Sequence, residues 1–423
     1  MARVSKELQS IKEMIAEDYK IDEEYIESME IDKDLILELQ ENAIMLSDTR
    51  DSNYIYHSVE SILLIVILGI LANCNTFVQI YLFMHKHKEW IKQNIYLDND
   101  LPSLSTIKRV IGMIIPEELE ELINISLSKH LYNSEPYYQD DDITINDLKD
   151  MDGKTMNSSN RNSSKNGKIS KINAMSVYSV NEKRCEATKF ISDKTNEIPT
   201  GVELLKKINI NGSIVLFDAL STQVETIKYI AEHKAFYVAP VKGNQSTLEE
   251  NIKLFFDEES NYTKVKDKNY LIVKEKAHGV ETREYCFSND IYWLYQKDRW
   301  KDIKSIGYVK RTYYDSNGKK ITDTRYFISN IDANKIALLS RAIRGEWEIE
   351  NGLHLYLDMV FLEDKNKCFL GNSQKNLNII RKFALALLKR YKITTNLSMN
   401  SIRFNISMDF EYEISNILKR ILI

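Results

Sequence analysis

Cysteine is scarce in this sequence of 423 residues, and its spacing excludes the usual roles of cysteine clusters. The four cysteines lie far apart and form no CxxC pair: Cys74, Cys185, Cys286 and Cys368. This pattern argues against a zinc ribbon, which needs closely paired cysteines, and against a disulfide framework. It fits a reducing compartment, and we expect a cytoplasmic protein.

Long apolar segments are also missing. The run ILLIVILGILA (62–72) has about a dozen residues, whereas a helix needs ~20 apolar residues to cross a bilayer. We interpret it as a buried core helix. The N-terminus shows no signal-peptide pattern, and we expect no membrane partner. The sequence also lacks a Walker phosphate loop and a dinucleotide-binding glycine fingerprint, so neither nucleotide site is indicated.

Charge is nearly balanced overall but unevenly placed. The net charge of −5 does not exclude nucleic acid, because a basic groove can hide in a neutral total. Residues 154–173 carry only lysine and arginine among their charged residues. Their Gly/Ser/Asn-rich part, 157–167, predicts a flexible loop. The basic residues here, beginning with Lys154, fit either a contact with DNA phosphate or a solvated linker.

Residues 1–135 are predicted to be helical. Within them, LPSLSTIKRVIGMI (101–114) predicts a Pro-Ser turn, a cap at Ser105 or Thr106, and a short helix. The segment is similar to the turn and second helix of a helix-turn-helix, in which Lys108 and Arg109 would contact DNA. Many helix hairpins share this pattern, so an ordinary hairpin is the alternative.

From about residue 143 the pattern changes to a mixed α/β layer with helices on its faces. One strand is predicted to end near Asp152. Two apolar, β-branched runs, GSIVLFDAL and AFYVAPVKG, are typical of buried central strands. Residues 261–331 predict a separate unit of short, aromatic-rich strands, and residues 332–423 are helical again.

Two aspartates of the α/β layer, Asp152 and Asp218, follow strands. Carboxyl ends of strands are where open α/β sheets place their chemistry. An Asp after four buried apolar residues is costly to desolvate unless it pairs or binds a metal. Each aspartate alone could equally be a helix cap or a turn residue.

A later segment, GEWEIENGLHLYLD (345–358), carries a polar residue at every fourth position. These residues share one broad helix face: Glu346, Glu350, His354 and Asp358. An apolar stripe runs beside them: Ile349, Leu353, Tyr356 and Val360. The pattern fits either a solvated polar face or a metal site completed by acids from elsewhere in the chain.

Three carboxylates without a cysteine or histidine cluster favour a hard, oxygen-preferring ion such as Mg²⁺ or Mn²⁺. Two such ions about 4 Å apart would activate an attacking oxygen and stabilise a leaving oxygen at a phosphodiester. This is the chemistry of polynucleotidyl transfer.

Six motifs then occur in a specific order: MDGKT, TNEIP, FDAL, VKGNQ, HGVETR and IRGEWEIENGLHLYLDMVFLED. In this combination the chain resembles the DDE transposases of the ISAs branch, the H-repeat-associated proteins, over about residues 55–392. The resemblance implies that Asp152, Asp218 and Glu350 are the catalytic residues and bind two Mg²⁺ or Mn²⁺ ions.

The resemblance also implies a fold. An RNase H-like catalytic core would begin within residues 143–260, carry a β-rich insertion at 261–331, and be completed by the helices of 332–423. An all-helical region (1–135) would precede it and C-terminal helices would follow it.

Other residues of these motifs are predicted to contact DNA. Lys242 and Asn244 close the last core strand and suit a phosphate, although a hairpin turn is the alternative. His278 and Arg283 share a strand face, where a structural salt bridge with Glu281 is the alternative. Arg344 matches the branch and could supply a phosphate contact.

Further residues have weaker signals. Trp293 could stack on an unpaired base, although a buried core aromatic would look the same. His354 and Asp358 are predicted to lie around the metal ligands, and a structural hydrogen bond is the alternative for His354. Glu346 departs from the family, because the branch usually has His there and related transposases have Arg. An acid at this position is expected to repel a phosphate.

The sequence therefore predicts an insertion-sequence transposase. It would bind the terminal inverted repeats of its element, hydrolyse a strand at each end, and join the freed 3′-OH to target DNA. The resemblance alone implies coordinated cutting of two double-stranded ends, and with it a homodimer in the DNA complex. The alternatives are a metal-dependent nuclease on the same fold, and a domesticated or decayed copy that binds DNA without catalysis.

Overall fold

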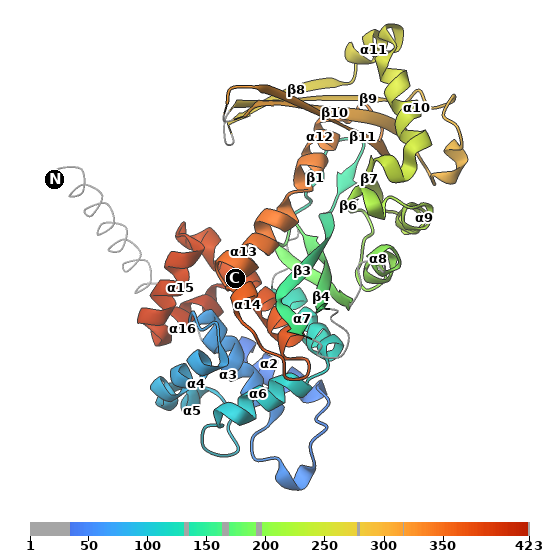
Figure 1. The fold of residues 1–423 in the computed structure, drawn as a ribbon. Coiled ribbons are helices and arrows are strands. Elements are labelled where there is room, and N and C mark those ends of the chain that lie inside the picture. The colour runs from blue at the N-terminus through green and yellow to red at the C-terminus, as the bar shows by residue number, and fades with distance from the viewer. Residues whose placement is uncertain are drawn as a thin grey trace, which may run out of the picture.

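The computed structural model describes residues 34–130, 135–162, 169–191, 197–276, 280–315 and 317–421. They form an elongated molecule with a helical body at one end and a large sheet that runs away from it (Figure 1). In the part of the chain so described, no helix is long and apolar enough to cross a membrane.

The helical body combines both ends of the chain. Its N-terminal helices are α2 (Asp34–Asn42), α3 (Val59–Leu71), α4 (Phe77–Lys86), α5 (Lys88–Asn94), α6 (Leu104–Met113) and α7 (Pro116–His130). Its C-terminal helices are α14 (Ser373–Thr395), α15 (Met399–Met408) and α16 (Phe410–Ile421). Both groups share one hydrophobic core, in which α14 packs against α3, α6, α7 and α16. The helices before and after the sheet are therefore one packing unit.

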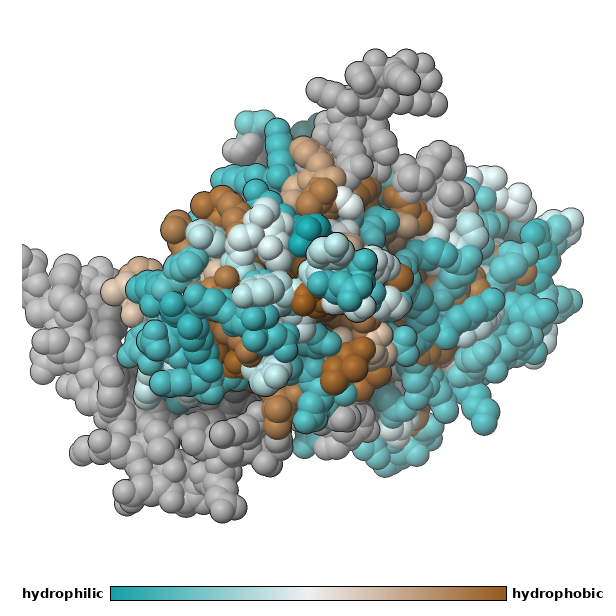
Figure 2. Space-filling model, turned by 90° about the horizontal axis from the view of Figure 1, so that it is seen from below, coloured by the Kyte–Doolittle hydropathy of each residue, from teal (hydrophilic) through white to brown (hydrophobic). Residues whose placement is uncertain are grey.

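The apolar run predicted as a core helix lies in α3. All of its residues except Glu60 are buried, and the Ser58 side chain caps it by accepting a hydrogen bond from the Ser61 N–H. The helix is hidden because other helices surround it. At the end of the helical body, apolar and hydrophilic side chains are interspersed on the surface (Figure 2).

The segment that resembles a helix-turn-helix contains α6. Its N-cap is Ser103, which accepts from the Thr106 N–H at 3.2 Å, so the predicted cap at Ser105 or Thr106 was wrong by two or three residues. The turn before α6 has Pro102, and an extended Ser103 suits a cap position better than a helical one. Of the two basic residues, Arg109 is exposed and Lys108 is half-buried.

A nine-stranded sheet forms the rest of the molecule, in the order β5-β4-β3-β6-β7-β11-β10-β9-β8. Its strands are β3 (Leu148–Asn162), β4 (Ile169–Ser179), β5 (Arg184–Ile191), β6 (Ile214–Phe217), β7 (Phe236–Val241), β8 (Tyr270–Lys276), β9 (Val280–Ser288), β10 (Ser305–Tyr314) and β11 (Lys320–Ser329). The β3–β6 and β6–β7 pairs are parallel, and the other pairs are antiparallel. A small hairpin, β1 (Tyr138–Gln139) with β2 (Thr144–Ile145), precedes the sheet.

Helices cover both faces of the central strands. On one face lie α8 (Glu197–Leu205), α9 (Val224–Glu232) and α10 (Ser246–Asp257), followed by α11 (Glu259–Lys266). On the other lies α12 (Ile336–Gly345). Successive side chains of a strand point to opposite faces. Accordingly, Val215 and Phe217 of β6 lie in the core beneath α8, α9 and α10, and Ile214 and Leu216 lie in the core beneath α12.

Two predictions about the strands were wrong. The first strand does not end near Asp152 but continues to Asn162, so much of the predicted loop 157–167 is β-strand. Pairing with β4 holds this polar stretch, through Met156↔Ile172 and, after a register shift, Arg161↔Ser170. Backbone hydrogen bonding to a neighbouring strand does not require apolar side chains. Residues 163–168 lie outside the described part of the chain.

The strands of 261–331 do not form a separate unit either. Strand β11 pairs with β7 through Tyr326↔Val241 to Ser329↔Val238, so β8 to β11 extend the same sheet. The short strands were recognisable from their aromatic pattern. Which edge they join depends on long-range pairing that the pattern does not encode.

Candidate metal centre

The two predicted aspartates directly follow the last paired residues of the parallel strands β3 and β6. In the β3–β6 pair Met151 is opposite Phe217, and Asp152 and Asp218 are the next residues on each chain. Asp218 follows the last residue of β6 and caps the turn Ala219–Ser221, accepting from the Ser221 N–H at 3.0 Å. The cap predicted as an alternative is therefore present. A carboxylate has further acceptor sites, so capping leaves Asp218 able to bind an ion.

Glu350 lies on a helical segment that follows β11 in the chain and packs against β3. It begins a π-helical turn, Glu350–His354, that continues into α13 (Leu355–Met359). The predicted apolar stripe is buried at Ile349, Leu353 and Val360 and packs into the core of the helical body. This anchors the segment that carries Glu350.

Two contacts fix the same segment against β3. The Ile349 N–H donates to Asp150 Oδ2 at 3.1 Å, and Asp150 is 1% exposed. Gly345, at the end of α12, lies so close to Leu148 that a Cβ there would collide with the leucine side chain. Burial raises the pKa of Asp150 well above its ordinary value, and the nearby charge of Asp152 adds to this. Asp150 was not recognised from the sequence, where it is one more acid in a polar stretch.

The centre brings together Asp152, Glu350 and His354. His354 Nδ1 lies 3.5 Å from Asp152 Oδ2 and 3.8 Å from Glu350 Oε2. One donor atom from each of the three residues lies within 4.8 Å of the others. His354, which the sequence analysis expected around the metal ligands, lies beside Asp152 and Glu350. π-Helical turns occur frequently at functional sites.

The electrostatics of the centre reflect crowded negative charge. Burial raises the pKa of Asp152, and the charges of Glu350 and Asp218 raise it further, while His354 opposes the effect. The pKa of Glu350 is lowered, chiefly because the His354 imidazole pairs with its carboxylate. Carboxylates that destabilise one another in this way are favourable ligands for a divalent cation, and the oxygen-rich donor set suits Mg²⁺ or Mn²⁺.

Lys154 and Asp358 pair with each other beside the centre. Lys154 Nζ bonds to Asp358 and lies 3.8 Å from Glu363 Oε2, and the Lys154 side chain is 10% exposed. Burial raises the pKa of Asp358, and Lys154 opposes this. The pair joins β3 to α13, so the Lys154 side chain is engaged within the protein.

The residues after β7 support the turn that holds Asp218. Asn244 Nδ2 donates to the Ala219 carbonyl at 2.7 Å, and Gln245 Nε2 donates to the Thr222 carbonyl at 3.2 Å. Lys242 is exposed at the same edge. The segment leads into α10 and is not the hairpin turn that the sequence left as an alternative.

Glu346 is not an isolated acid. Its Oε2 accepts from Arg325 Nη1 at 2.8 Å. Arg325 directly precedes Tyr326, which pairs with Val241 at the end of β7. The structure thus supplies a guanidinium from β11 beside Glu346, one turn before Glu350. Sequence reasoning missed Arg325 because 21 residues separate it from its partner.

Arg283 and Arg344 line a cleft of about 940 Å³. The cleft lies beside the helical segment that carries Glu350, and it does not include the carboxylates of the candidate metal centre. Trp347, Glu348 and Asn351 line this cleft, and Glu350 does not. Its basic side chains are Lys183, Arg283, Arg311, Arg341, Arg344 and Arg390, and its acids are Glu182, Glu281 and Glu348. We call it the arginine cleft. Its cations come from distant segments, which is why the sequence disclosed only two of them.

Several arginines of the cleft are ion-paired. Glu281 holds Arg283 at 2.5 Å and Arg311 at 2.7 Å, and Arg344 lies 2.9 Å from Glu275. The salt bridge named as the alternative for Arg283 is therefore present. His278 lies outside the described residues.

The remaining predicted contact, Trp293, sits on the connection between β9 and β10. It is 40% exposed, stacks on Phe255 with ring centroids 4.9 Å apart, and donates from Nε1 to the Asp290 carbonyl at 2.8 Å. The structure does not bring Trp293, Lys108 or Arg109 into contact with the carboxylates.

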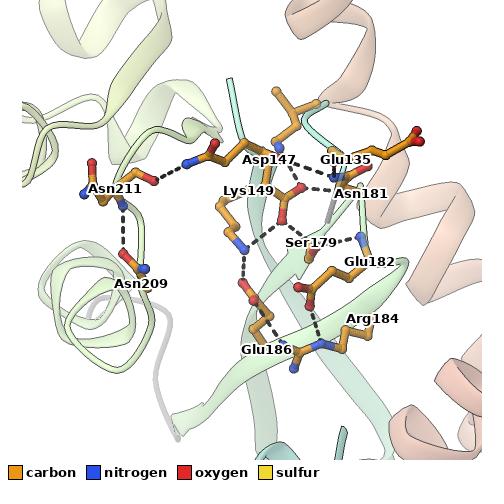
Figure 3. A network of polar contacts seen from close by, with 12 residues as sticks. Glu135, Asp147, Lys149, Ser179, Asn181, Glu182, Arg184, Glu186, Asn209 and Asn211 are labelled. Carbon is orange, nitrogen blue, oxygen red and sulfur yellow. Dashed lines mark hydrogen bonds and ion pairs between the residues drawn. The ribbon is translucent and has the colours of Figure 1, made fainter. Parts of the chain in front are cut away.

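A second buried polar network occupies the opposite end of β3 (Figure 3). Lys149 Nζ lies 2.7 Å from Asp147 Oδ2 and 2.6 Å from Glu186 Oε2, and Arg184 pairs with Glu182 at 2.5 Å. Its charges compensate one another within the protein. We interpret it as a structural link between β3, β5 and the turn that precedes β5.

Comparison with known proteins agrees with the sequence motifs. The family model described as "Transposase DDE domain" matches residues 139–387, and a model described as "DDE_Tnp_1-associated" matches residues 44–125. The "H repeat-associated putative transposase YhhI" of Escherichia coli K12 is 28% identical over 365 residues, covering 84% of this chain and 91% of the relative. "Putative transposase YncI" of Escherichia coli O157:H7 is 28% identical over 359 residues, which cover 82% of this chain and 86% of the relative.

One solved structure is distantly similar. The piggyBac transposase synaptic complex with hairpin DNA matches at a TM-score of 0.38 and 12% identity, covering 91% of this chain and 78% of that one. A likeness at this level adds no argument about the site.

Proposed function

The chain belongs to the transposases with a DDE domain, and we propose that Asp152, Asp218 and Glu350 are its metal-binding catalytic residues. It is an insertion-sequence transposase, an enzyme that cuts and joins DNA strands. The observations that carry the proposal are two: Asp152 and Asp218 directly follow the paired residues Met151 and Phe217 of β3 and β6, and Asp152 lies in one group with Glu350 and His354.

We further propose that the core is RNase H-like. Its first five long strands have the order β5-β4-β3-β6-β7, with antiparallel pairs on one side of β3 and parallel pairs on the other. Asp152 lies on the first of these strands, Asp218 follows the fourth and Glu350 lies on a late helix. This is the arrangement that the family resemblance implied.

Mg²⁺ or Mn²⁺ ions, two in number, would activate the attacking oxygen and stabilise the leaving oxygen of a phosphodiester when bound at this site. The protein's part is to hold the carboxylates in place. Ile349 and Gly345 fix the helix of Glu350 to β3, and Asn244 fixes the turn of Asp218. Lys242 stands exposed at the same edge, where an ammonium suits a DNA phosphate.

The arginine cleft is our candidate for the path of the DNA backbone. Six basic side chains against three acidic ones give it an excess of positive charge in a chain whose net charge is −5. Arg283 and Arg344 belong to this path. A backbone in the cleft would run along the helix that carries Glu350, so a phosphodiester beyond its end could reach the carboxylates. Because both element ends are cut together, we propose a homodimer on paired ends.

The experiment is a cleavage and joining assay on duplex DNA that carries the flanking ends of the gene, with Mg²⁺, Mn²⁺ or a chelator. Metal-dependent cleavage followed by joining is expected. Cleavage without joining would favour a nuclease on the same fold. Binding without cleavage would indicate a domesticated or decayed copy, an alternative that the intact Asp152, Asp218 and Glu350 disfavour. We also propose that the protein acts in the bacterial cytoplasm, where the DNA of the element lies.

A further inference from the structure

We propose that His354 binds the divalent ion directly through Nδ1, so that the centre has a nitrogen ligand and prefers Mn²⁺ to Mg²⁺. The inference rests on the proposed function for the presence of an ion, and it assigns His354 a role of its own. Its basis is the placement of the imidazole, which lies 3.5 Å from an Asp152 oxygen and 3.8 Å from a Glu350 oxygen.

These separations suit ligands of one ion better than a hydrogen bond. Donor atoms about 2.1 Å from an octahedral ion are about 3.0 Å apart when adjacent and about 4.2 Å apart when opposite. Both His354 distances fall within that range. Both are longer than the distance of about 2.9 Å near which N–H···O hydrogen bonds cluster.

The burial of His354 strengthens the argument. The residue is 5% exposed, and its Nε2 has no hydrogen-bond partner among the residues that the structure describes. A buried histidine with a structural role is expected to use its ring nitrogens in hydrogen bonds. A cation bound between the three groups would give Nδ1 and the two carboxylates a common partner.

The backbone around His354 is fixed before any ion binds. The π-helical turn is supported at Gly352, where an added Cβ would lie 3.0 Å from the Tyr178 hydroxyl oxygen and 3.2 Å from Lys389 Nζ. Leu353 is buried in the core of the helical body. The imidazole is therefore held at the centre by its own segment, as a preorganised ligand must be.

The chemical consequence concerns the choice of ion. Imidazole suits transition metals, whereas Mg²⁺ prefers oxygen ligands and retains bound water. Without His354, the proposed ligands Asp152, Asp218 and Glu350 would form an oxygen site that takes Mg²⁺ readily. A nitrogen from His354 favours Mn²⁺.

The test is pulsed electron paramagnetic resonance of Mn²⁺ bound to the full chain, produced with ¹⁵N-labelled histidine and kept in excess over the metal. We expect a ¹⁵N hyperfine coupling on bound Mn²⁺ that disappears in His354→Gln. It should persist in His233→Gln, a matched control at an exposed position on the end of α9. Circular dichroism of each variant verifies folding.

The outcomes separate this inference from the proposed function. Bound Mn²⁺ without a nitrogen coupling would overturn the His354 ligand and leave an all-oxygen site and the transposase function intact. A coupling that survives in His354→Gln would also overturn it. If the wild type binds no Mn²⁺, both the ligand and the proposed metal centre fail.

A second measurement uses an oxygen ligand at the same position. In His354→Asp the ratio of the Mg²⁺ to the Mn²⁺ dissociation constant should fall by on the order of tenfold, because the nitrogen preference is gone. A merely structural histidine would alter both constants together and leave their ratio unchanged.

Discussion

Replacing Gly345 by alanine should damage catalysis more than folding. An alanine Cβ would overlap Leu148 Cδ2, and Leu216 Cδ1 lies 3.6 Å from the same point, so the leucine has little room to turn away. Leu148 is fully buried at the start of β3. Carbon atoms need about 3.5–4.0 Å, so α12 must lift from β3 by roughly 1 Å or more. Overpacking of this kind costs about 1–3 kcal/mol.

The effect on activity follows from the position of Gly345, five residues before Glu350. A displacement of about 1 Å of a catalytic group can reduce the rate by on the order of 100-fold. The assay is single-turnover strand cleavage together with urea denaturation. Gly243→Ala is the stability control, because a Cβ there meets nothing within 4 Å. A Gly345→Ala protein with wild-type cleavage would refute the claim that close packing on β3 positions Glu350.

Three further predictions concern buried and cleft charges. Burial lowers the pKa of Lys389 from 10.5 to about 7, so its favourable contribution to folding is lost as pH falls from 10.5 towards 7, by at most about 5 kcal/mol. Urea denaturation between pH 7 and 9 should show this slope in the wild type and a flatter profile in Lys389→Met. Lys149→Met removes the ammonium that lies between the buried carboxylates of Asp147 and Glu186 and should cost about 3–5 kcal/mol of unfolding free energy, whereas Lys228→Met at an exposed pair should cost less than about 1 kcal/mol. In the arginine cleft, Arg390→Ala should weaken binding of all DNA sequences alike and reduce the slope of log affinity against log salt by about 0.9, measured by fluorescence anisotropy. An unchanged slope would remove Arg390 from the DNA path.

Much of the central layer could be predicted because its signals are local. The apolar runs before Asp218 and Lys242 identified buried strands, and the spacing of Ile349, Leu353 and Val360 identified the buried side of the helix that carries Glu350. Motif order then related Asp152, Asp218 and Glu350 to one another. Each of these inferences uses residues whose burial or chemistry is visible within about ten positions.

The features that escaped prediction depend on long-range contacts. The continuation of β3 to Asn162 depends on pairing with β4, and the joining of β11 to β7 depends on a strand 80 or more residues away in sequence. The ion pair of Arg325 with Glu346 follows from that joining, and it changes the interpretation of Glu346 from a repulsive acid to the partner of an arginine. Sequence patterns report the burial of a segment and not its neighbour in space.

The most direct test of the central claim is single-turnover cleavage and joining of the element ends by Glu350→Gln, compared with Glu348→Gln. Both glutamates are exposed on the same helical segment, but Glu350 lies in the group with Asp152 and His354 and Glu348 lines the arginine cleft. We expect that Glu350→Gln abolishes cleavage and joining while still binding the DNA, and that Glu348→Gln retains both reactions. Cleavage by Glu350→Gln at the wild-type rate would contradict the central claim.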